Sequence, residues 1–215
     1  MAGKFITFEG GEGAGKSTQI HHLAAHLAEC GIRVVTTREP GGTPAAEAIR
    51  DFILGGSASA MGTEAEALLF AAARADHVER VIRPALESNA WVLCDRFTDS
   101  TRVYQGAEGG VPPETLAALE RIAVGDSRPN LTIILDIPPE VGLARVKARH
   151  AATGAGPDRF DSEALDPHAR RRAAFLALAE ADPGRCLVVD ATRSEKEVAD
   201  DIWRNVTARL FRAAA

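Results

Sequence analysis

One octapeptide near the amino terminus constrains the fold more than any other stretch of this chain. It spans residues 10–17, reads Gly-Gly-Glu-Gly-Ala-Gly-Lys-Ser and directly follows the apolar run 5–8. Residues 16–29, which come next, carry apolar side chains at helical spacing. In such a strand–loop–helix unit, the glycines let backbone N–H groups converge on phosphate oxygens at the start of the helix. The pattern predicts a phosphate-binding loop, with Lys16 reaching the β- and γ-phosphates of a nucleotide and Ser17 ligating Mg²⁺.

Four further apolar runs predict buried strands, at residues 33–37, 90–94, 131–135 and 186–189. Helical patterns separate them, and we expect helices at 44–54, 63–87, 98–105, 112–124, 138–148, 161–181 and 194–211. Thr43 is placed to cap the first of these, Thr63 and Glu66 have the spacing of a capping box, and Leu68 belongs to the apolar side of that helix. Residues 55–62 and 150–158 are expected to be loops. The alternation is typical of an α/β fold, a five-stranded parallel sheet with helices on both faces.

Composition bounds the class of protein. The 215 residues, 46% hydrophobic and 26% charged, suit one globular domain over 1–215. No apolar run approaches the roughly 18 residues of a membrane span and no signal peptide is apparent, so we expect a cytoplasmic protein with no membrane partner. A net charge of −5 without a basic run argues against nucleic acid as a partner. Cys30, Cys94 and Cys186 lie among apolar neighbours and are expected to be buried thiols.

Polar segments directly follow several predicted strands. They are the phosphate loop, residues 38–42 after the second strand, Asp95-Arg96 after the third and Asp136 after the fourth. Because ligands bind beyond the carboxyl ends of parallel strands, we expect these segments to form one site. Asp136 suits either the ligand shell of a magnesium ion or the cap of the next helix, and the sequence leaves both open.

The phosphate loop alone does not say whether the nucleotide is a switch, a fuel or a substrate. A GTP-binding switch is expected to carry Asp-x-x-Gly and Asn-Lys-x-Asp motifs, and the chain has neither. Arginines stand instead at the ends of several predicted elements, as phosphoryl transfer between two phosphate-bearing molecules requires. They are Arg38, Arg50, Arg74, Arg96, Arg149 and Arg159. The alternatives are a kinase for another acceptor and a binding switch that signals to a protein.

Five stretches together resemble the thymidylate kinase family. They are residues 10–17, 37–43, 69–74, 95–106 and 135–140, and the likeness runs in unbroken order from residue 5 to about 210. The resemblance implies a P-loop NTPase fold of the nucleoside monophosphate kinase type, with a short lid at residues 149–160. It also implies an enzyme that transfers the γ-phosphoryl group of ATP to dTMP, giving dTDP for dTTP biosynthesis. Mg²⁺ would be the cofactor, and a homodimer the assembly.

The resemblance also assigns roles to individual residues. Phe70 would stack on thymine, and three side chains would reach the base edge: Arg74, Thr101 and Gln105. Glu12 would approach the sugar, and Tyr104 would crowd its 2′ position. The acceptor phosphate would be bound by Arg96, with Arg38 and Arg50 nearby.

The donor side follows from the phosphate loop. The residues expected to bind ATP are Gly10, Gly11, Glu12, Gly13, Ala14, Gly15, Lys16, Ser17 and Thr18. Magnesium would be organised by Ser17 and Asp95. The residues expected to be catalytic are Lys16, Glu12, Arg96, Arg149 and Arg159.

One position departs from part of the family. Some members carry an arginine directly after the acidic residue of the phosphate loop, where this chain has Gly13. Members without it resemble this chain in having basic residues in the lid, where Arg149 and Arg159 stand. We therefore expect a lid arginine to approach the transferred phosphoryl group.

Overall fold

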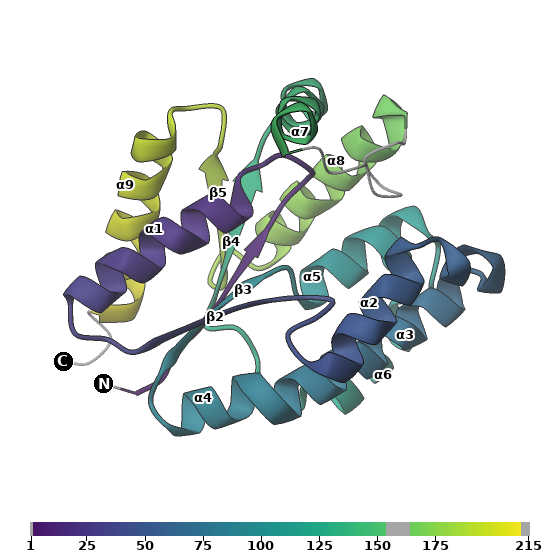
Figure 1. Ribbon diagram of the computed structural model, residues 1–215, viewed down its shortest axis with the longest axis horizontal. Helices are drawn as coiled ribbons and strands as arrows, with labels where there is room; N and C mark the ends of the chain where they lie inside the picture. The colour runs from purple at the N-terminus through teal and green to yellow at the C-terminus, as the bar shows by residue number, and fades with distance from the viewer. Residues whose placement is uncertain (1, 154–163, 212–215) are drawn as a thin grey trace.

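Five parallel strands form the centre of the fold (Figure 1). The computed structural model describes residues 2–153 and 164–211. Its strands are β1 (Phe5–Glu9), β2 (Val34–Arg38), β3 (Trp91–Asp95), β4 (Leu131–Asp136) and β5 (Cys186–Asp190). They lie in the order β2-β3-β1-β4-β5, and every neighbouring pair is parallel. The predicted five-stranded parallel sheet is therefore confirmed. The prediction that every strand is buried is wrong for β2 and β5, which are only partly buried because they form the two edges of the sheet.

Helices cover both faces of the sheet. On one face, α1 (Lys16–Glu29) and α9 (Glu195–Val206) pack against each other and over Ile6 and Phe8 of β1. On the other, α4 (Arg83–Glu87) and α6 (Pro113–Val124) pack over Phe5 of β1, and α8 (Leu165–Ala181) packs over Ile134 of β4. Because successive side chains of a strand point to opposite faces, one continuous apolar run supplies both cores.

The remaining helices lie towards the carboxyl edge of the sheet (Figure 1). They are α2 (Pro44–Leu54), α3 (Thr63–His77), α5 (Thr98–Thr101) and α7 (Pro139–Thr153). The Thr43 side chain caps α2 as predicted, by accepting a hydrogen bond from the backbone N–H of Ala46 at 3.1 Å. Within the described ranges, no helix is both long and apolar enough to cross a membrane.

Some local predictions are wrong. Thr63 does not begin a capping box, because Gly62 is the N-cap of α3 and the Glu66 side chain is buried instead of reaching back to it. Cys30 is exposed because it lies at the surface end of α1, whereas Cys94 and Cys186 are buried as expected. Leu68 is 57% exposed, on the outer side of α3.

Three expected segment boundaries also differ. The segment expected to be an open loop at 55–62 contains a 3-10 turn (Ser57–Met61), and the helix begun by α5 continues as a π-helical segment (Arg102–Glu108). α7 runs to Thr153, past the expected loop start at residue 150, because this stretch is rich in alanine, arginine and lysine, all strong helix formers. Residues 154–160 of the expected lid, Arg159 among them, and the expected start of a helix at 161 lie outside the described residues.

The phosphate loop packs directly on the start of α7. Gly13 has a φ of +70°, and a Cβ placed on it would overlap the carbonyl oxygen of Gly142. A Cβ on Gly142 would in turn overlap the carbonyl oxygen of Glu12. A side chain at position 13 therefore requires α7 to move away from the loop, and glycine there fixes how close α7, which carries Arg149, can lie.

Candidate active site

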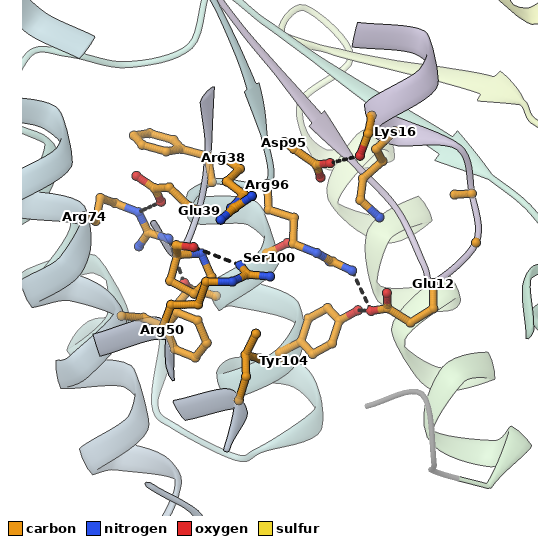
Figure 2. Close-up of a pocket in the computed structure, with 18 of the residues that line it drawn as sticks. Glu12, Lys16, Arg38, Glu39, Arg50, Arg74, Asp95, Arg96, Ser100 and Tyr104 are labelled. Carbon is orange, nitrogen blue, oxygen red and sulfur yellow. Dashed lines mark hydrogen bonds and ion pairs between the residues drawn. The ribbon is translucent and has the colours of Figure 1, made fainter. Parts of the chain in front are cut away.

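A cavity of about 480 Å³ opens at the carboxyl edge of the sheet, where the polar segments were expected to meet. Figure 2 shows Lys16 and Glu12 on one side, Arg38, Glu39, Arg50 and Arg74 on the other, and Arg96 between them. The expected residues that line it are Glu12, Gly13, Ala14, Gly15, Lys16, Ser17, Thr18, Arg38, Arg50, Phe70, Arg74, Asp95, Arg96, Thr101, Tyr104, Gln105 and Arg149. The expected convergence is present for the ends of β1, β2 and β3, whereas Asp136 at the end of β4 is not among the residues that line the cavity.

Gly10 and Gly11 are not among the residues that line the cavity, but their carbonyls hold the lysine of the loop. The Lys16 ammonium donates to the Gly10 carbonyl at 3.2 Å and to the Gly11 carbonyl at 3.0 Å. Burial lowers the pKa of Lys16, and the positive charge of Arg96 adds to the effect. The loop therefore holds its cation in place by its own backbone.

Ser17 and Asp95 meet at the mouth of the loop. The Ser17 hydroxyl donates to Oδ2 of Asp95 at 2.7 Å, which joins the start of α1 to the end of β3. A hydroxyl and a carboxylate oxygen this close are the hard oxygen ligands that Mg²⁺ prefers. In phosphoryl-transfer sites Mg²⁺ is bound by one or two such groups, with substrate phosphates and water completing its shell. The pair therefore fits the expected metal.

Glu12 accepts two hydrogen bonds across the cavity. Nη2 of Arg96 donates to its Oε1 at 2.6 Å, and the Tyr104 hydroxyl donates to the same oxygen at 3.0 Å. The Arg96 guanidinium also lies 5.1 Å from the centre of the Tyr104 ring. Burial by itself would raise the pKa of Glu12, but Arg96 and Lys16 outweigh it and lower the pKa to about 2. Glu12 is therefore an anion that pairs with the cation of the neighbouring loop.

A buried carboxylate, Glu9, holds the turn that carries Arg96. Arg96 has a left-handed backbone with φ 67°, which is uncommon for a residue other than glycine. Glu9, fully buried at the end of β1, accepts from the Phe97 N–H at 2.8 Å and from the Ser100 hydroxyl at 2.6 Å. That hydroxyl also accepts from Arg96 at 3.1 Å. Glu9 was not among the site residues expected from the sequence, although an acidic residue that ends an apolar strand was a visible signal.

The protonation of Glu9 reflects its surroundings. Burial raises the pKa of Glu9 to about 7, and the negative charge of Asp99 contributes to the rise. Asp99 is itself buried and accepts two hydrogen bonds from the Arg185 guanidinium, at 2.6 and 3.2 Å. The carboxylate that raises the pKa of Glu9 is therefore itself paired with a cation.

The far side of the cavity is formed by α2, α3 and the segment after α5. Phe70 and Arg74 lie on one face of α3, half-buried and buried respectively. Arg50 donates to the Pro40 carbonyl at 2.9 Å, and Arg38 forms an ion pair with Glu47 at 3.0 Å. The cavity is also lined by residues to which the sequence assigned no role: Glu39, Pro40, Leu54, Phe97 and Ser100.

A second cavity, of about 440 Å³, adjoins the first. Both are lined by Thr18, by Arg149 and by the loop residues Gly13, Ala14 and Gly15. The rest of its wall consists of Gln19, Arg145, Ala191, Arg193, Ser194, Glu195 and Val198. The phosphate loop and Arg149 thus border both cavities.

Asp136 pairs with an arginine. Its two carboxylate oxygens accept from Nε and Nη2 of Arg172 at 2.7 and 2.8 Å, a bidentate contact between β4 and α8. The residues that line the two cavities do not include Asp136. Its carboxylate therefore ties α8 to the sheet.

Comparisons with known proteins find the same family along nearly the whole chain. Residues 8–202 match the family model described as thymidylate kinase. A thymidylate kinase from Bradyrhizobium sp. (strain ORS 278) is 54% identical over 99% of this chain and 93% of its own length, and one from Rhodopseudomonas palustris (strain BisB18) is 56% identical over 97% and 90%. The crystal structure of thymidylate kinase from Ehrlichia chaffeensis superposes with a TM-score of 0.76 at 31% identity, covering 96% of this chain and 99% of that one.

The raised pKa of Glu9 predicts the direction in which the stability of the fold changes with pH. The pKa of Glu9 is raised from 4.5 to about 7. Between these two pH values, the Glu9 carboxyl is protonated in the folded chain and ionised in the unfolded chain. The contribution of Glu9 to the free energy of unfolding is fully present below pH 4.5 and is lost as the pH rises through about 7. The total loss is roughly 3 kcal/mol. We expect the free energy of urea unfolding of the wild type to fall, relative to that of Glu9→Gln, as the pH rises from about 5 to 8.

Glu12→Gln is the matched control for this measurement. Because the pKa of Glu12 is lowered to about 2, its contribution is present above 4.5 and is lost only as the pH falls towards 2. The difference between Glu12→Gln and the wild type should therefore stay constant over the same pH interval. Parallel pH profiles for the wild type and Glu9→Gln would show that Glu9 does not take up a proton on folding.

Proposed function

Because this chain belongs to the thymidylate kinase family and phosphorylates dTMP to dTDP with ATP, we propose that its two adjoining cavities hold the two substrates. The larger cavity would bind dTMP, and the smaller would bind the nucleoside part of ATP. One observation carries this assignment: the phosphate loop and Arg149 border both cavities. Phosphates that enter from the two sides would meet there.

The residues of the larger cavity suit the parts of dTMP. Phe70 would stack on the thymine ring, with Arg74, Thr101 and Gln105 at its edge. The sugar would lie near Glu12 and Tyr104, which already contact each other at 3.0 Å. Since Glu12 is ionised near neutral pH, its carboxylate would accept a hydrogen bond from the sugar hydroxyl. Arg96 would bind the acceptor phosphate, with Arg38 and Arg50 beside it.

On the donor side, the loop backbone from Gly10 to Thr18 would hold the ATP phosphates. Lys16, which contacts its own loop carbonyls at 3.0 and 3.2 Å, would exchange these for the β- and γ-phosphate oxygens. Ser17 and Asp95 would hold Mg²⁺, which when bound neutralises charge on the β- and γ-phosphates. Arg145 and Arg193 lie in the smaller cavity and complete the wall around the donor.

Phosphoryl transfer here needs no covalent enzyme intermediate. An anionic oxygen of the dTMP phosphate attacks the γ-phosphorus of ATP, and the bond from that phosphorus to the β–γ bridging oxygen breaks as ADP leaves. The work of the protein is to align the two phosphates and to stabilise the spread charge. Lys16 and Arg96 line the larger cavity and Arg149 borders both, so these three cations would stabilise that charge.

The division between the cavities can be tested with a pair of variants. Phe70→Ala removes the stacking surface and should raise the KM for dTMP by about tenfold, with the KM for ATP nearly unchanged. Arg193→Ala should do the reverse, raising the KM for ATP by about tenfold. Steady-state assays of ADP release measure both. The assignment fails if either variant affects the two constants equally.

The same assay decides between acceptors. Across a panel of nucleoside monophosphates, dTMP should give the highest turnover, and Phe70→Ala should reduce that preference. Clear turnover of another acceptor above dTMP would contradict the assignment of the thymine pocket. ADP release no faster than with water alone would contradict transfer itself.

We also propose that a lid arginine reaches the transferred phosphoryl group. Arg149 lies on α7 and borders both cavities, and Arg159 is the second basic residue of the expected lid. Arg149→Ala should lower kcat by about a hundredfold or more while changing both KM values much less. Arg145→Ala, on the same helix but bordering only the smaller cavity, is the control and should mainly raise the KM for ATP. Unchanged turnover in both Arg149→Ala and Arg159→Ala would refute the lid arginine.

We further propose that the chain is a single kinase domain, that it forms a homodimer and that it acts in the cytoplasm. Of the seven exposed large apolar side chains among the described residues, four lie on α2, α3, α6 and the turn before α3: Phe52, Met61, Leu68 and Ile122. α3 packs against both α2 and α6, so a second copy could cover these side chains together.

Charge on this face should therefore break the dimer. The double variant Leu68→Glu/Ile122→Glu should sediment near the chain mass of 22.8 kDa, and the wild type near twice that mass. Val141→Glu, on the exposed side of α7, is the control and should leave the dimer intact. A double variant that still sediments as a dimer would place the interface elsewhere.

A further inference from the structure

A buried chain of polar contacts forms the part of the larger cavity's wall that carries Arg74 and Thr101. Nδ1 of His77 donates to Oε1 of Glu39 at 2.9 Å, and Nε of Arg74 donates to Oε2 of the same carboxylate at 2.7 Å. The chain continues from His77 to the Thr37 hydroxyl at 2.7 Å and from Arg74 to the Thr101 hydroxyl at 3.1 Å. It thereby links β2 and α3 to α5.

These groups are shielded from water. The side chains of Arg74, Glu39 and His77 are 5%, 3% and 0% exposed. The loop after β2 closes over the histidine, since a Cβ placed on Gly42 would lie within 2.6 Å of the ring. Replacing a buried ion pair by apolar groups is often neutral or stabilising. Stability alone therefore does not explain why this pair is present.

The network determines how Arg74 faces a ligand. Nε and Nη2 are engaged by Glu39 and Thr101, and the guanidinium carbon lies 5.1 Å from the centre of the Phe97 ring. The plane of the guanidinium is thus held on two edges and one face, as Figure 2 shows for Glu39 and Arg74. Its five N–H donors exceed those that the two contacts use, and Arg74 lines the cavity.

A guanidinium offers donors and no acceptor. Held in place, it favours a pyrimidine that presents a carbonyl oxygen at position 4 and opposes one that presents an amino group there. A flexible arginine discriminates less, because it can turn its donors away from the amino group. The discrimination thus depends on what holds the arginine.

We propose that Glu39 and His77 are positioning residues for base selection: through Arg74 they set the preference for a 4-carbonyl over a 4-amino pyrimidine monophosphate. The inference rests on the proposed function, because it requires the base to lie against Arg74. Glu39 acts directly on Arg74. His77 acts one contact further away, by fixing the second oxygen of the Glu39 carboxylate.

The experiment compares kcat/KM for dTMP with that for dCMP. Glu39→Gln has nearly the same shape, but its amide turns an NH₂ group towards one of two donors, Arg74 or His77. We expect the dTMP:dCMP ratio of kcat/KM to fall at least tenfold, through a higher KM for dTMP, with the KM for ATP within twofold of the wild type. His77→Leu, which removes both ring contacts, should lower the ratio in the same direction. His77→Asn, which keeps a donor for Glu39, should restore most of it.

Asp76→Asn is the matched control for folding effects. Asp76 precedes His77 on α3 and pairs with Thr43 and Arg80, each at 2.5 Å, so its loss perturbs the same helix without touching Arg74. Its melting temperature should fall while the ratio stays at the wild-type value. A fall in melting temperature without a change of ratio in Glu39→Gln and His77→Leu would overturn the proposal and leave the network purely structural.

Arg74→Met separates base recognition by Arg74 from the positioning of Arg74 by Glu39. If this variant abolishes the preference for dTMP and Glu39→Gln does not, the assignment of the base pocket is supported and the positioning role of Glu39 is refuted. If Arg74→Met also keeps the preference, the base is not recognised at this end of the cavity, and both assignments fail.

Discussion

The ion pair between Arg96 and Glu12 is the interaction on which the rest of the site depends. At 2.6 Å it joins the phosphate loop after β1 to the turn after β3, and Tyr104 donates to the same carboxylate. The turn carries a left-handed φ at Arg96, a conformation that costs a non-glycine residue about 1 kcal/mol or more. Glu9 offsets this cost by accepting hydrogen bonds from Phe97 and Ser100. The two loops are thus brought together by the sheet and held by charge.

Pairing of an arginine with a carboxylate recurs around the larger cavity. Arginines that line it are held by carboxylates, as in the pairs Arg96–Glu12, Arg74–Glu39 and Arg38–Glu47. A chain with a net charge of −5 can in this way present positive charge where phosphates are expected. Because a guanidinium donates in a fixed plane, its orientation matters as much as its charge. The carboxylates are best understood as the groups that set this orientation.

Close backbone packing extends the organisation to the donor side. Gly13 and Gly142 are in contact, with no room for a Cβ on either. The position of the phosphate loop and the position of α7 therefore depend on each other. α7 carries Arg145 and Arg149, which line the smaller cavity, and Arg149 also borders the larger one. An arginine at position 13 would disrupt this contact. Gly13 and the position of the helix that carries Arg149 are therefore linked by the same packing.

The sequence by itself determined the sheet, the phosphate loop and the edge at which the strand ends meet, because apolar runs and glycine spacing act locally. Phe70, Arg74 and Gln105 came from a family likeness, and the structure places them in the cavity. Tertiary structure alone decided that Glu9 holds the Arg96 turn and that Glu39 pairs with Arg74, because these partners lie far apart in the chain. It also turned Glu66 inward, away from the expected capping box. Spacing along the chain reveals which charges exist, and only packing decides which of them meet.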